Sequence, residues 1–323
     1  MRGRGRAAAL LVLAALASSC AKEGPPPVMR PREGPVALPV DEVGPRVLLA
    51  EQRDAVRRRD ADGFVRSWAE DGFFLGPTAQ SALEGRAAIR ARLAALLGAL
   101  PPVSVQVAEH GFGLTGDGRG AWAFQELTLA PREGASVTYR VSTALTRGRE
   151  GWRIVAQAWT LPVPNEAALA AAERFPAPRA LEESGAGACA EVVSDLRSWR
   201  EGGEPMGEAW VGSLSVGTAR EEVAPTDEAM LARWREGLES GALRIRALAG
   251  GIRCRDHGSV VVSAFNETLE LGPEGGRTAL PVRVFVVHVE SEGVVLPVHW
   301  HVALPLPERE RAAPSAPPTE ARP

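Results

Sequence analysis

The sequence predicts an α+β protein built from two tandem copies of one domain. Its 323 residues are enough for about two domains. In each half, segments with helical periodicity come first and strand-like segments follow, which is typical of helices packed on an antiparallel sheet. The two halves also resemble each other in sequence, so the two predicted domains have the same order of elements.

Five landmarks of the first half recur in the second half at a spacing of 141 to 143 residues. Chance does not hold one spacing over five landmarks, so the sequence predicts a duplicated domain of roughly 120–130 residues. The pairs are Trp68–Gly76 with Trp210–Gly217, Gly85–Leu93 with Thr226–Trp234, Ala123–Glu126 with Ala264–Glu267, Arg140 with Arg283, and Pro162–Pro164 with Pro305–Pro307.

Residues 1–19 are expected to be a signal peptide. The basic stretch MRGRGR precedes AAALLVLAALA, an apolar run of about eleven residues that is too short to span a bilayer. The following ASSC resembles the lipobox of bacterial lipoproteins, with Ala17 where Leu is usual. This resemblance implies lipidation of Cys20, anchoring to a membrane through that lipid, and a location in the cell envelope. Ala21 after the cysteine favours the outer membrane, facing the periplasm.

Residues 20–43 are rich in proline and glycine and have no helical period, so we expect a disordered tether. Residues 308–323 have the same character and are expected to be a disordered tail. Between them we expect domain 1 at 44–164, a linker helix at 165–185 with Asn165 as its N-cap, and domain 2 at 186–307.

Each copy shows the same succession of signals. Apolar residues at three- and four-residue steps predict the helices, Pro101 stops one of them, and Glu-Gly pairs mark the last hairpin turns. The expected helices are 47–57, 61–68 and 87–97 in domain 1 and 189–199 and 227–238 in domain 2; a strand begins at Phe73, and the last turns fall at 149–151 and 292–293.

The segments WAEDGFFLGP, GRAAIRARL and WRIVAQAWTLP resemble the SnoaL-like branch of the nuclear transport factor 2 superfamily. The resemblance extends over 44–164 and, in diverged form, over 186–307. It implies two cone-like domains, in each of which a curved antiparallel sheet wraps around helices and leaves a pocket at the wide end. The superfamily contains enzymes as well as non-catalytic binders, so the fold does not decide the function. Members often dimerise through their sheets, which implies an intramolecular pseudo-dimer here.

The run VVLPVHWHVALP holds His299 and His301, which share one face of a strand, with Trp300 on the other. The first copy has Ala156 and Ala158 at these positions. If the hairpin pairs Arg283 with His301 and Phe285 with His299, His288 points the other way, with Trp300. A guanidinium beside the imidazoles disfavours a metal site, which needs three or four converging ligands.

Three interpretations of these residues remain open. In the first, Glu267, Arg283, His299 and His301 carry out proton transfer in a small-molecule isomerase or hydrolase. In the second, a pocket binds an anionic or polar small molecule without catalysis. In the third, the arginines and glutamates are structural ion pairs and the histidines are hydrogen-bonded inside the cone. We favour binding or scaffolding; the pocket candidates are Glu267, Arg283, Phe285, His299, His301, Glu126 and Arg140.

Composition and short motifs also bear on the partners, the cofactors and the state of the two cysteines of domain 2. Acidic residues outnumber basic ones and the net charge is −3, which disfavours nucleic acid as a partner. No glycine-rich phosphate loop is present, and we assign no cofactor, metal or catalytic residue. A protein–protein interaction module is a further alternative. Cys189 and Cys254 have no motif spacing, and we favour two buried thiols over a disulfide.

Overall fold

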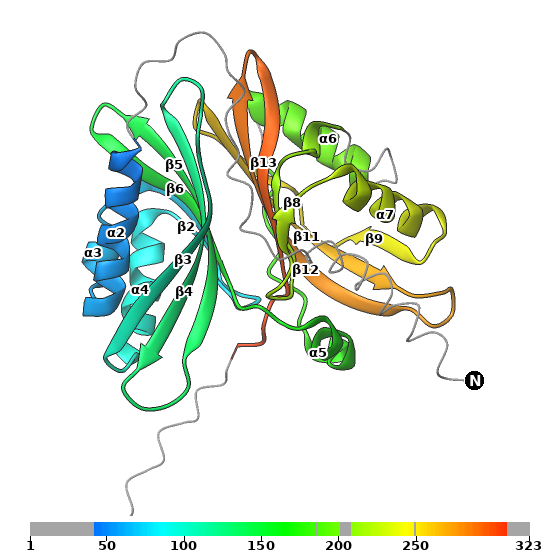
Figure 1. Cartoon of the computed structure of the whole chain (residues 1–323), viewed down its shortest axis with the longest axis horizontal. Coiled ribbons are helices and arrows are strands. Elements are labelled where there is room, and N and C mark those ends of the chain that lie inside the picture. The colour runs from blue at the N-terminus through cyan, green and yellow to red at the C-terminus, as the bar shows by residue number, and fades with distance from the viewer. Residues whose placement is uncertain (1–41, 185–186, 201–207, 249, 309–323) are drawn as a thin grey trace, which may run out of the picture.

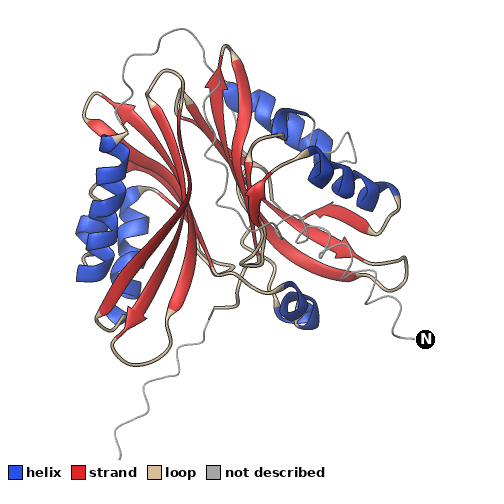
Figure 2. Cartoon of the chain, viewed as in Figure 1, coloured by secondary structure: helices blue, strands red, loops and turns tan. Residues whose placement is uncertain are grey.

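The computed structural model describes residues 42–184, 187–200, 208–248 and 250–308. Cys20, the signal peptide, most of the expected tether and nearly all of the expected tail lie outside these residues. The chain folds as an α+β protein with two sheets, and the helices of each half cover the outer side of its own sheet (Figures 1 and 2). None of the helices in the described ranges combines the length and the apolar character needed to cross a membrane.

The first half holds three helices and a six-stranded sheet in the order β2-β1-β6-β5-β4-β3. Asp60 caps the second helix through the N–H of Gly63, and Arg59 ends the first in a left-handed conformation. The elements are α2 (Val43–Arg58), α3 (Ala61–Val65), β1 (Trp68–Leu75), β2 (Ala82–Glu84), α4 (Arg86–Ala99), β3 (Val103–Leu114), β4 (Gly120–Pro131), β5 (Val137–Gly148) and β6 (Gly151–Thr160).

The second half repeats this arrangement after a short connection. Its sheet runs β8-β7-β13-β12-β11, and β9 and β10 both pair with β11 where β3 pairs with β4 in the first half. The elements are α5 (Asn165–Ala170), η2 (Ala172–Arg174), α6 (Ala188–Arg200), η3 (Glu208–Trp210), β7 (Leu214–Val216), β8 (Val223–Pro225), α7 (Glu228–Glu239), β9 (Leu243–Ala247), β10 (Arg253–Asp256), β11 (Val260–Leu271), β12 (Thr278–Ser291) and β13 (Val294–Ala303).

Two expectations about the second half and its connection are wrong. Asn165 lies within α5, whose N-cap is Pro164, and its amide donates instead to Glu222 at 2.7 Å. Cys189 and Cys254 form a disulfide that joins α6 to β10, rather than two separate thiols. Spacing in the sequence could not predict this bond, because it depends on how the helix packs against the sheet edge.

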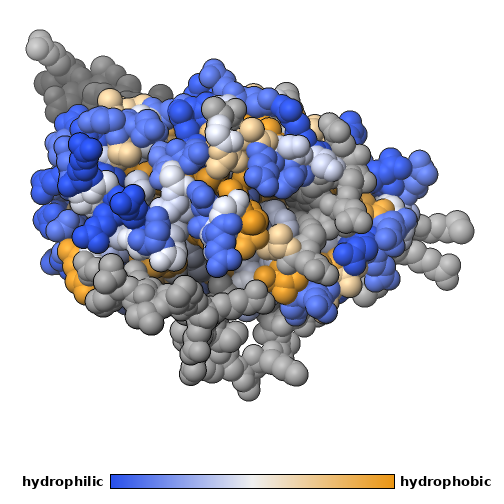
Figure 3. Space-filling model, turned by 90° about the horizontal axis from the view of Figure 1, so that it is seen from above, coloured by the Kyte–Doolittle hydropathy of each residue, from blue (hydrophilic) through white to orange (hydrophobic). Residues whose placement is uncertain are grey.

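The described part of the chain forms three hydrophobic cores. One lies between the helices and the sheet of the first half, and a second lies at the same place in the second half. The third contains residues of both halves, because the two sheets pack face to face. The surface seen in Figure 3 is mostly hydrophilic, with hydrophobic residues in small groups. The contact between the two sheets is therefore a hydrophobic core in its own right, beside the core of each half.

Candidate functional site

The predicted site residues of the second half lie on two different faces of its sheet. Arg283, Phe285, His299 and His301 face the first half, whereas Trp300 lies in the core of the second half. Glu267 pairs with Val282, which belongs to that same core, so its side chain is on the face opposite to Arg283. The structure therefore brings Arg283, Phe285 and His301 to one cavity but does not gather all of the predicted residues around it.

The two histidines belong to a chain of hydrogen bonds between the halves. His299 Nδ1 lies 3.0 Å from the carbonyl oxygen of Leu214, and its Nε2 lies 2.7 Å from Ser142 Oγ. Ser142 Oγ also lies 2.8 Å from His301 Nδ1, and His301 Nε2 lies 2.9 Å from Thr160 Oγ1. Ser142 and Thr160 belong to the first half, so the chain joins the two sheets.

The carbonyl at one end fixes the direction of the chain. A carbonyl only accepts, so the Nδ1–H of His299 must donate to Leu214. Its Nε2 is then an acceptor and receives the hydroxyl proton of Ser142. Ser142 Oγ in turn accepts from the Nδ1–H of His301, whose Nε2 accepts from the hydroxyl of Thr160. Both imidazoles are neutral in this arrangement and both use both nitrogens.

Burial explains why the histidines stay neutral. Desolvation lowers the pKa of His299 to about 3, against a smaller opposing effect of the bond to Leu214. Desolvation, with the nearby His299 and Arg140, holds the pKa of His301 well below its usual value. The histidines are hydrogen-bonded, as one interpretation expected, but across the interface and not inside the cone.

Aromatic rings of the first half pack on these imidazoles. Trp122 lies parallel to His299 with ring centres 5.5 Å apart. The ring centre of Phe124 lies 5.6 Å from that of His299 and 5.9 Å from that of His301, with the last two rings nearly perpendicular. The contacts bury both histidines almost completely. Their surroundings are those of a packed core rather than of an open site.

Two arginines hold the halves together in an equivalent way. Arg140 of β5 donates to the carbonyl oxygens of Gly217 and Arg220, in the loop after β7. Arg283 of β12 donates to those of Gly76 and Ala79, in the loop after β1.

Backbone bonds repeat this relationship, since Val163 N–H donates to Thr218 and Leu306 N–H to Pro77. The contact is thus nearly two-fold symmetric, like that of a symmetric dimer.

The glutamates break this symmetry. Glu126 pairs across the strands with Arg140 and lies 3.4 Å from its guanidinium, as one interpretation expected. The residue opposite Arg283 is Asn266, not Glu267. The sequence match of Ala123–Glu126 with Ala264–Glu267 is therefore displaced by one residue in the sheet, and such a shift reverses every side chain. The expected Arg283–Glu267 ion pair is wrong for this reason.

The hairpin register also differs from the expected one. Phe285 pairs with His301 and Arg283 pairs with Ala303, so the shift is two residues. A two-residue shift keeps each side chain on its face. His288 accordingly points to the face of Trp300, where its Nε2 lies 3.0 Å from Ser263 Oγ.

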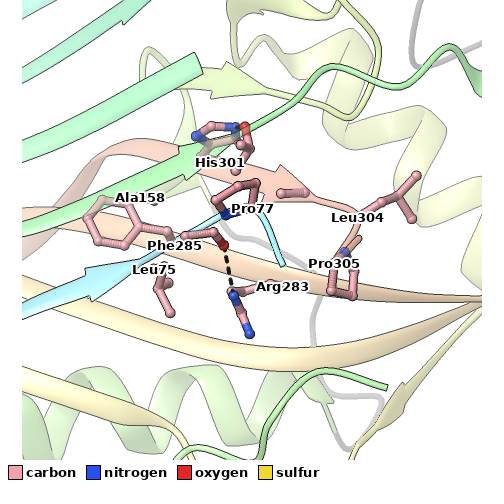
Figure 4. Close-up of a pocket in the computed structure, with 11 residues that line it drawn as sticks. Leu75, Pro77, Ala158, Arg283, Phe285, His301, Leu304 and Pro305 are labelled. Atoms are coloured by element: carbon pink, nitrogen blue, oxygen red, sulfur yellow. Dashed lines mark hydrogen bonds between the residues drawn. The ribbon is translucent and has the colours of Figure 1, made fainter. Parts of the chain in front are cut away.

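A cavity of about 10 Å³ adjoins Arg283 and His301 at the interface (Figure 4). This volume accommodates about one water molecule. Its wall includes Thr160 and Gly76 of the first half and Pro305 after β13. The cavity is too small for the organic ligand expected at these residues.

A larger cavity, about 50 Å³, lies inside the second half. Met230 and Trp234 of α7 form one wall, and Leu269, Trp300 and Val302 of the sheet form the other. The hydroxyl and carboxylate groups of the lining come from β7 and the loop after it: Ser215, Thr218 and Glu222. Sequence reasoning missed this site. The available signal was the four-residue spacing of Met230 and Trp234, which places both on one face of a helix.

Among the described ranges, no group of three or more His, Cys, Asp or Glu side chains is arranged to hold a metal ion. The lining of the larger cavity contains one carboxylate, that of Glu222. Its oxygens already accept from the amide of Asn165 and the N–H of Ala219. The cavity can therefore hold a mainly apolar molecule and orient it with hydroxyl groups.

Comparison with known proteins gives a family for part of the chain. Residues 49–157 match the family described as SnoaL-like domain. No curated protein matches the sequence.

Three solved structures illustrate the structural matches. An NTF2-like protein of unknown function from Pseudomonas putida KT2440 is 20% identical (40% of this chain, 92% of that chain, TM-score 0.36). A domain of unknown function with a cystatin-like fold from Nostoc punctiforme PCC 73102 is 17% identical (51% of this chain, 99% of that chain, TM-score 0.37). A ketosteroid isomerase-like protein from Erwinia carotovora atroseptica SCRI1043 is 13% identical (38% of this chain, 99% of that chain, TM-score 0.33). The family match therefore identifies residues 49–157, in the first half of the chain, as similar to a SnoaL-like domain.

Proposed function

We propose that this protein is a non-catalytic binder of a small, mainly apolar molecule, held in the 50 Å³ cavity of the second half. The observation that carries the proposal is the composition of its walls. Two tryptophans, a methionine and three aliphatic side chains surround the space, and the hydroxyl and carboxylate groups of the lining come from three residues, Ser215, Thr218 and Glu222. Sites for small molecules commonly combine an apolar lining with a few polar groups that fix orientation.

The first half has a defined part in this proposal, which is to hold one edge of the cavity. Gly217, Thr218 and Glu222 line the cavity from the loop after β7. The guanidinium of Arg140 donates to the carbonyl oxygen of Gly217 at 2.9 Å, and the backbone N–H of Val163 donates to the carbonyl oxygen of Thr218 at 2.8 Å. The loop would therefore be less ordered without the first half.

The proposal includes an intramolecular pseudo-dimer, which is supported by side chains of complementary size. Ser142, Ala156 and Ala158 of the first half are small where the second half has Phe285, His299 and His301. The reverse holds for Trp122 and Phe124, which have Val262 and Ala264 as their equivalents.

Ser142 contacts both His299 and His301 across this face. Two copies of the second half would place Phe285 against these two histidines, and two copies of the first half would place Ser142 against two alanines, so this contact favours the pairing of unlike halves. Scattering that shows two separated lobes at all protein concentrations would contradict the pseudo-dimer.

The alternative of an isomerase or hydrolase has less support. It relied on Glu267, Arg283, His299 and His301 acting together, and Glu267 lies across the sheet from the other three. The alternative of a protein–protein interaction module has no specific observation in its favour.

A screen of small apolar and aromatic compounds against the purified chain tests the proposed function. A bound compound should raise the melting temperature and change the fluorescence of Trp234 and Trp300. Ala224→Phe, which places a ring in the cavity wall, should abolish both effects. Val294→Phe adds the same ring at an exposed position of β13 and should keep them. Compounds that bind Ala224→Phe as well as the natural chain would refute this site.

We also propose that Cys20 carries a lipid and anchors the protein in the cell envelope, in the outer membrane facing the periplasm. The support is the sequence of the first twenty residues. Incorporation of a labelled fatty acid, lost in Cys20→Ser, together with a shift from the membrane to the soluble fraction, is the expected result. If the Cys20→Ser variant fractionates with membranes as well as the natural chain does, the result would contradict the anchor.

A further inference from the structure

The two equivalent arginines differ in the charges around them. Three carboxylates interact electrostatically with Arg140, those of Glu126, Glu221 and Glu222. The cross-strand register and the loop bonds place Asn266, Gln80 and Ser81 at the matching positions beside Arg283. Each acid near one arginine is thus a neutral polar residue near the other.

Arg283 is consequently a buried cation with no carboxylate partner among the described residues. Its side chain is almost fully buried, and its Nε–H has no acceptor. Burial alone lowers the pKa of Arg283, to about 10, so the guanidinium stays charged at neutral pH. Three carbonyl oxygens satisfy its other nitrogens but bring no negative charge. A buried charge without a counter-charge is strongly unfavourable.

The 10 Å³ cavity lies directly beside this cation (Figure 4). Its volume suits one particle of about the size of a water molecule. Neutral groups form the remaining wall, among them the apolar side chains of Leu75, Ala158 and Phe285. The cavity therefore places a single small occupant next to this positive charge.

We propose that the cavity beside Arg283 binds one small monovalent anion, of which chloride is the reference, between the two halves. Such an ion supplies the negative charge that Glu126, Glu221 and Glu222 supply at Arg140. Sulfate and phosphate are too large for the space. A water molecule could accept the Nε–H bond but would leave the charge uncompensated, so the test must distinguish halide from water.

The first test measures the melting temperature of the full chain in sodium chloride and in sodium gluconate at equal ionic strength. Chloride should raise the melting temperature by about 2–4 °C and the effect should saturate. Asn266→Glu places a carboxylate opposite Arg283, as Glu126 stands opposite Arg140, and should abolish the response. Thr268→Glu adds the same charge two residues along β11 and should retain it. An equal response in Asn266→Glu would overturn the proposal.

The second test does not depend on a variant. A crystal of the full chain soaked in sodium bromide should show an anomalous peak within hydrogen-bonding distance of Arg283 Nε. Density for water without an anomalous signal at this position would overturn the proposal, even if bromide is found on the surface.

Discussion

Arg140 and Arg283 occupy equivalent positions in the two halves, and each guanidinium crosses to the opposite half to bind the loop after its first strand. Only Arg140 has a buried carboxylate beside it, Glu126. The two contacts therefore share one geometry but differ in electrostatics. This difference makes their contributions to stability separable by mutation.

Arg140→Met is expected to destabilise the protein more than Arg283→Met. Loss of Arg140 leaves the buried Glu126 without its closest cation and should cost about 3 kcal/mol. Loss of Arg283 removes an uncompensated charge along with its carbonyl bonds and should cost about 1 kcal/mol. Denaturant unfolding in gluconate measures both. Equal losses would show that the charges around the two arginines do not matter.

Ser142→Ala is expected to break the hydrogen-bond chain at its centre. The hydroxyl is the partner of both His299 Nε2 and His301 Nδ1, and both nitrogens are buried. Leaving two buried polar atoms unsatisfied should cost about 2–4 kcal/mol in the free energy of unfolding. Thr138→Ala removes a hydroxyl from a half-buried part of the same strand and should cost less than about 1 kcal/mol. Similar losses in both variants would mean that the chain contributes little.

Much of the fold could be predicted from sequence, because repeat spacing and periodicity are properties of the chain itself. Most of the helices, the last turns and the face shared by His299 and His301 follow from them. The second helix and the first strand differ from the expectation, because α3 ends at Val65 and β1 already begins at Trp68 rather than at Phe73. The sequence match that paired Glu126 with Glu267 failed because identical letters do not fix strand register. Because the register of β4 and that of β11 differ by one residue, the side chain of Glu267 points into the core of the second half and not toward the first half.

The position of the candidate site could not be predicted for a different reason. The alternation in VVLPVHWHVALP shows that the histidines and Trp300 point in opposite directions, but not which face lines a cavity. The histidines pack against the other half and Trp300 lines the cavity. Only the packing of two sheets decides this, and it depends on residues about 140–160 positions apart, such as Ser142 and His301.

Reduction of the Cys189–Cys254 disulfide is expected to destabilise the second half. The bond closes a loop with a sequence separation of 65 residues, for which loop entropy predicts a loss of about 4 kcal/mol. Unfolding with and without reductant measures the loss, and Cys189→Ser with Cys254→Ser should match the reduced chain. Two alkylatable thiols in the folded, untreated protein would contradict the bond.

Acidification is expected to destabilise the protein through its buried histidines. Burial lowers the pKa of His288 and His299 to about 3, and lowers that of His301 and His257 as well. An unfolded histidine binds its proton below about pH 6.5, while these remain neutral in the folded protein. Between these two values the unfolded state holds more protons. Stability is therefore complete above pH 6.5 and falls as the pH drops toward 3.

The size of this effect can be stated for a single residue. Each such histidine should contribute about 1.4 kcal/mol of lost stability for each pH unit below 6.5. Denaturant unfolding at pH 7.5 and 5.5 lies above the range in which unperturbed carboxyl groups titrate, so it isolates the histidines. His288→Gln should reduce the loss by about one histidine's share, because Gln is neutral at both values and can still bond to Ser263. A stability that is equal at the two pH values would mean that the imidazoles take up protons in the folded state, and the neutral hydrogen-bond chain through Ser142 would then be wrong.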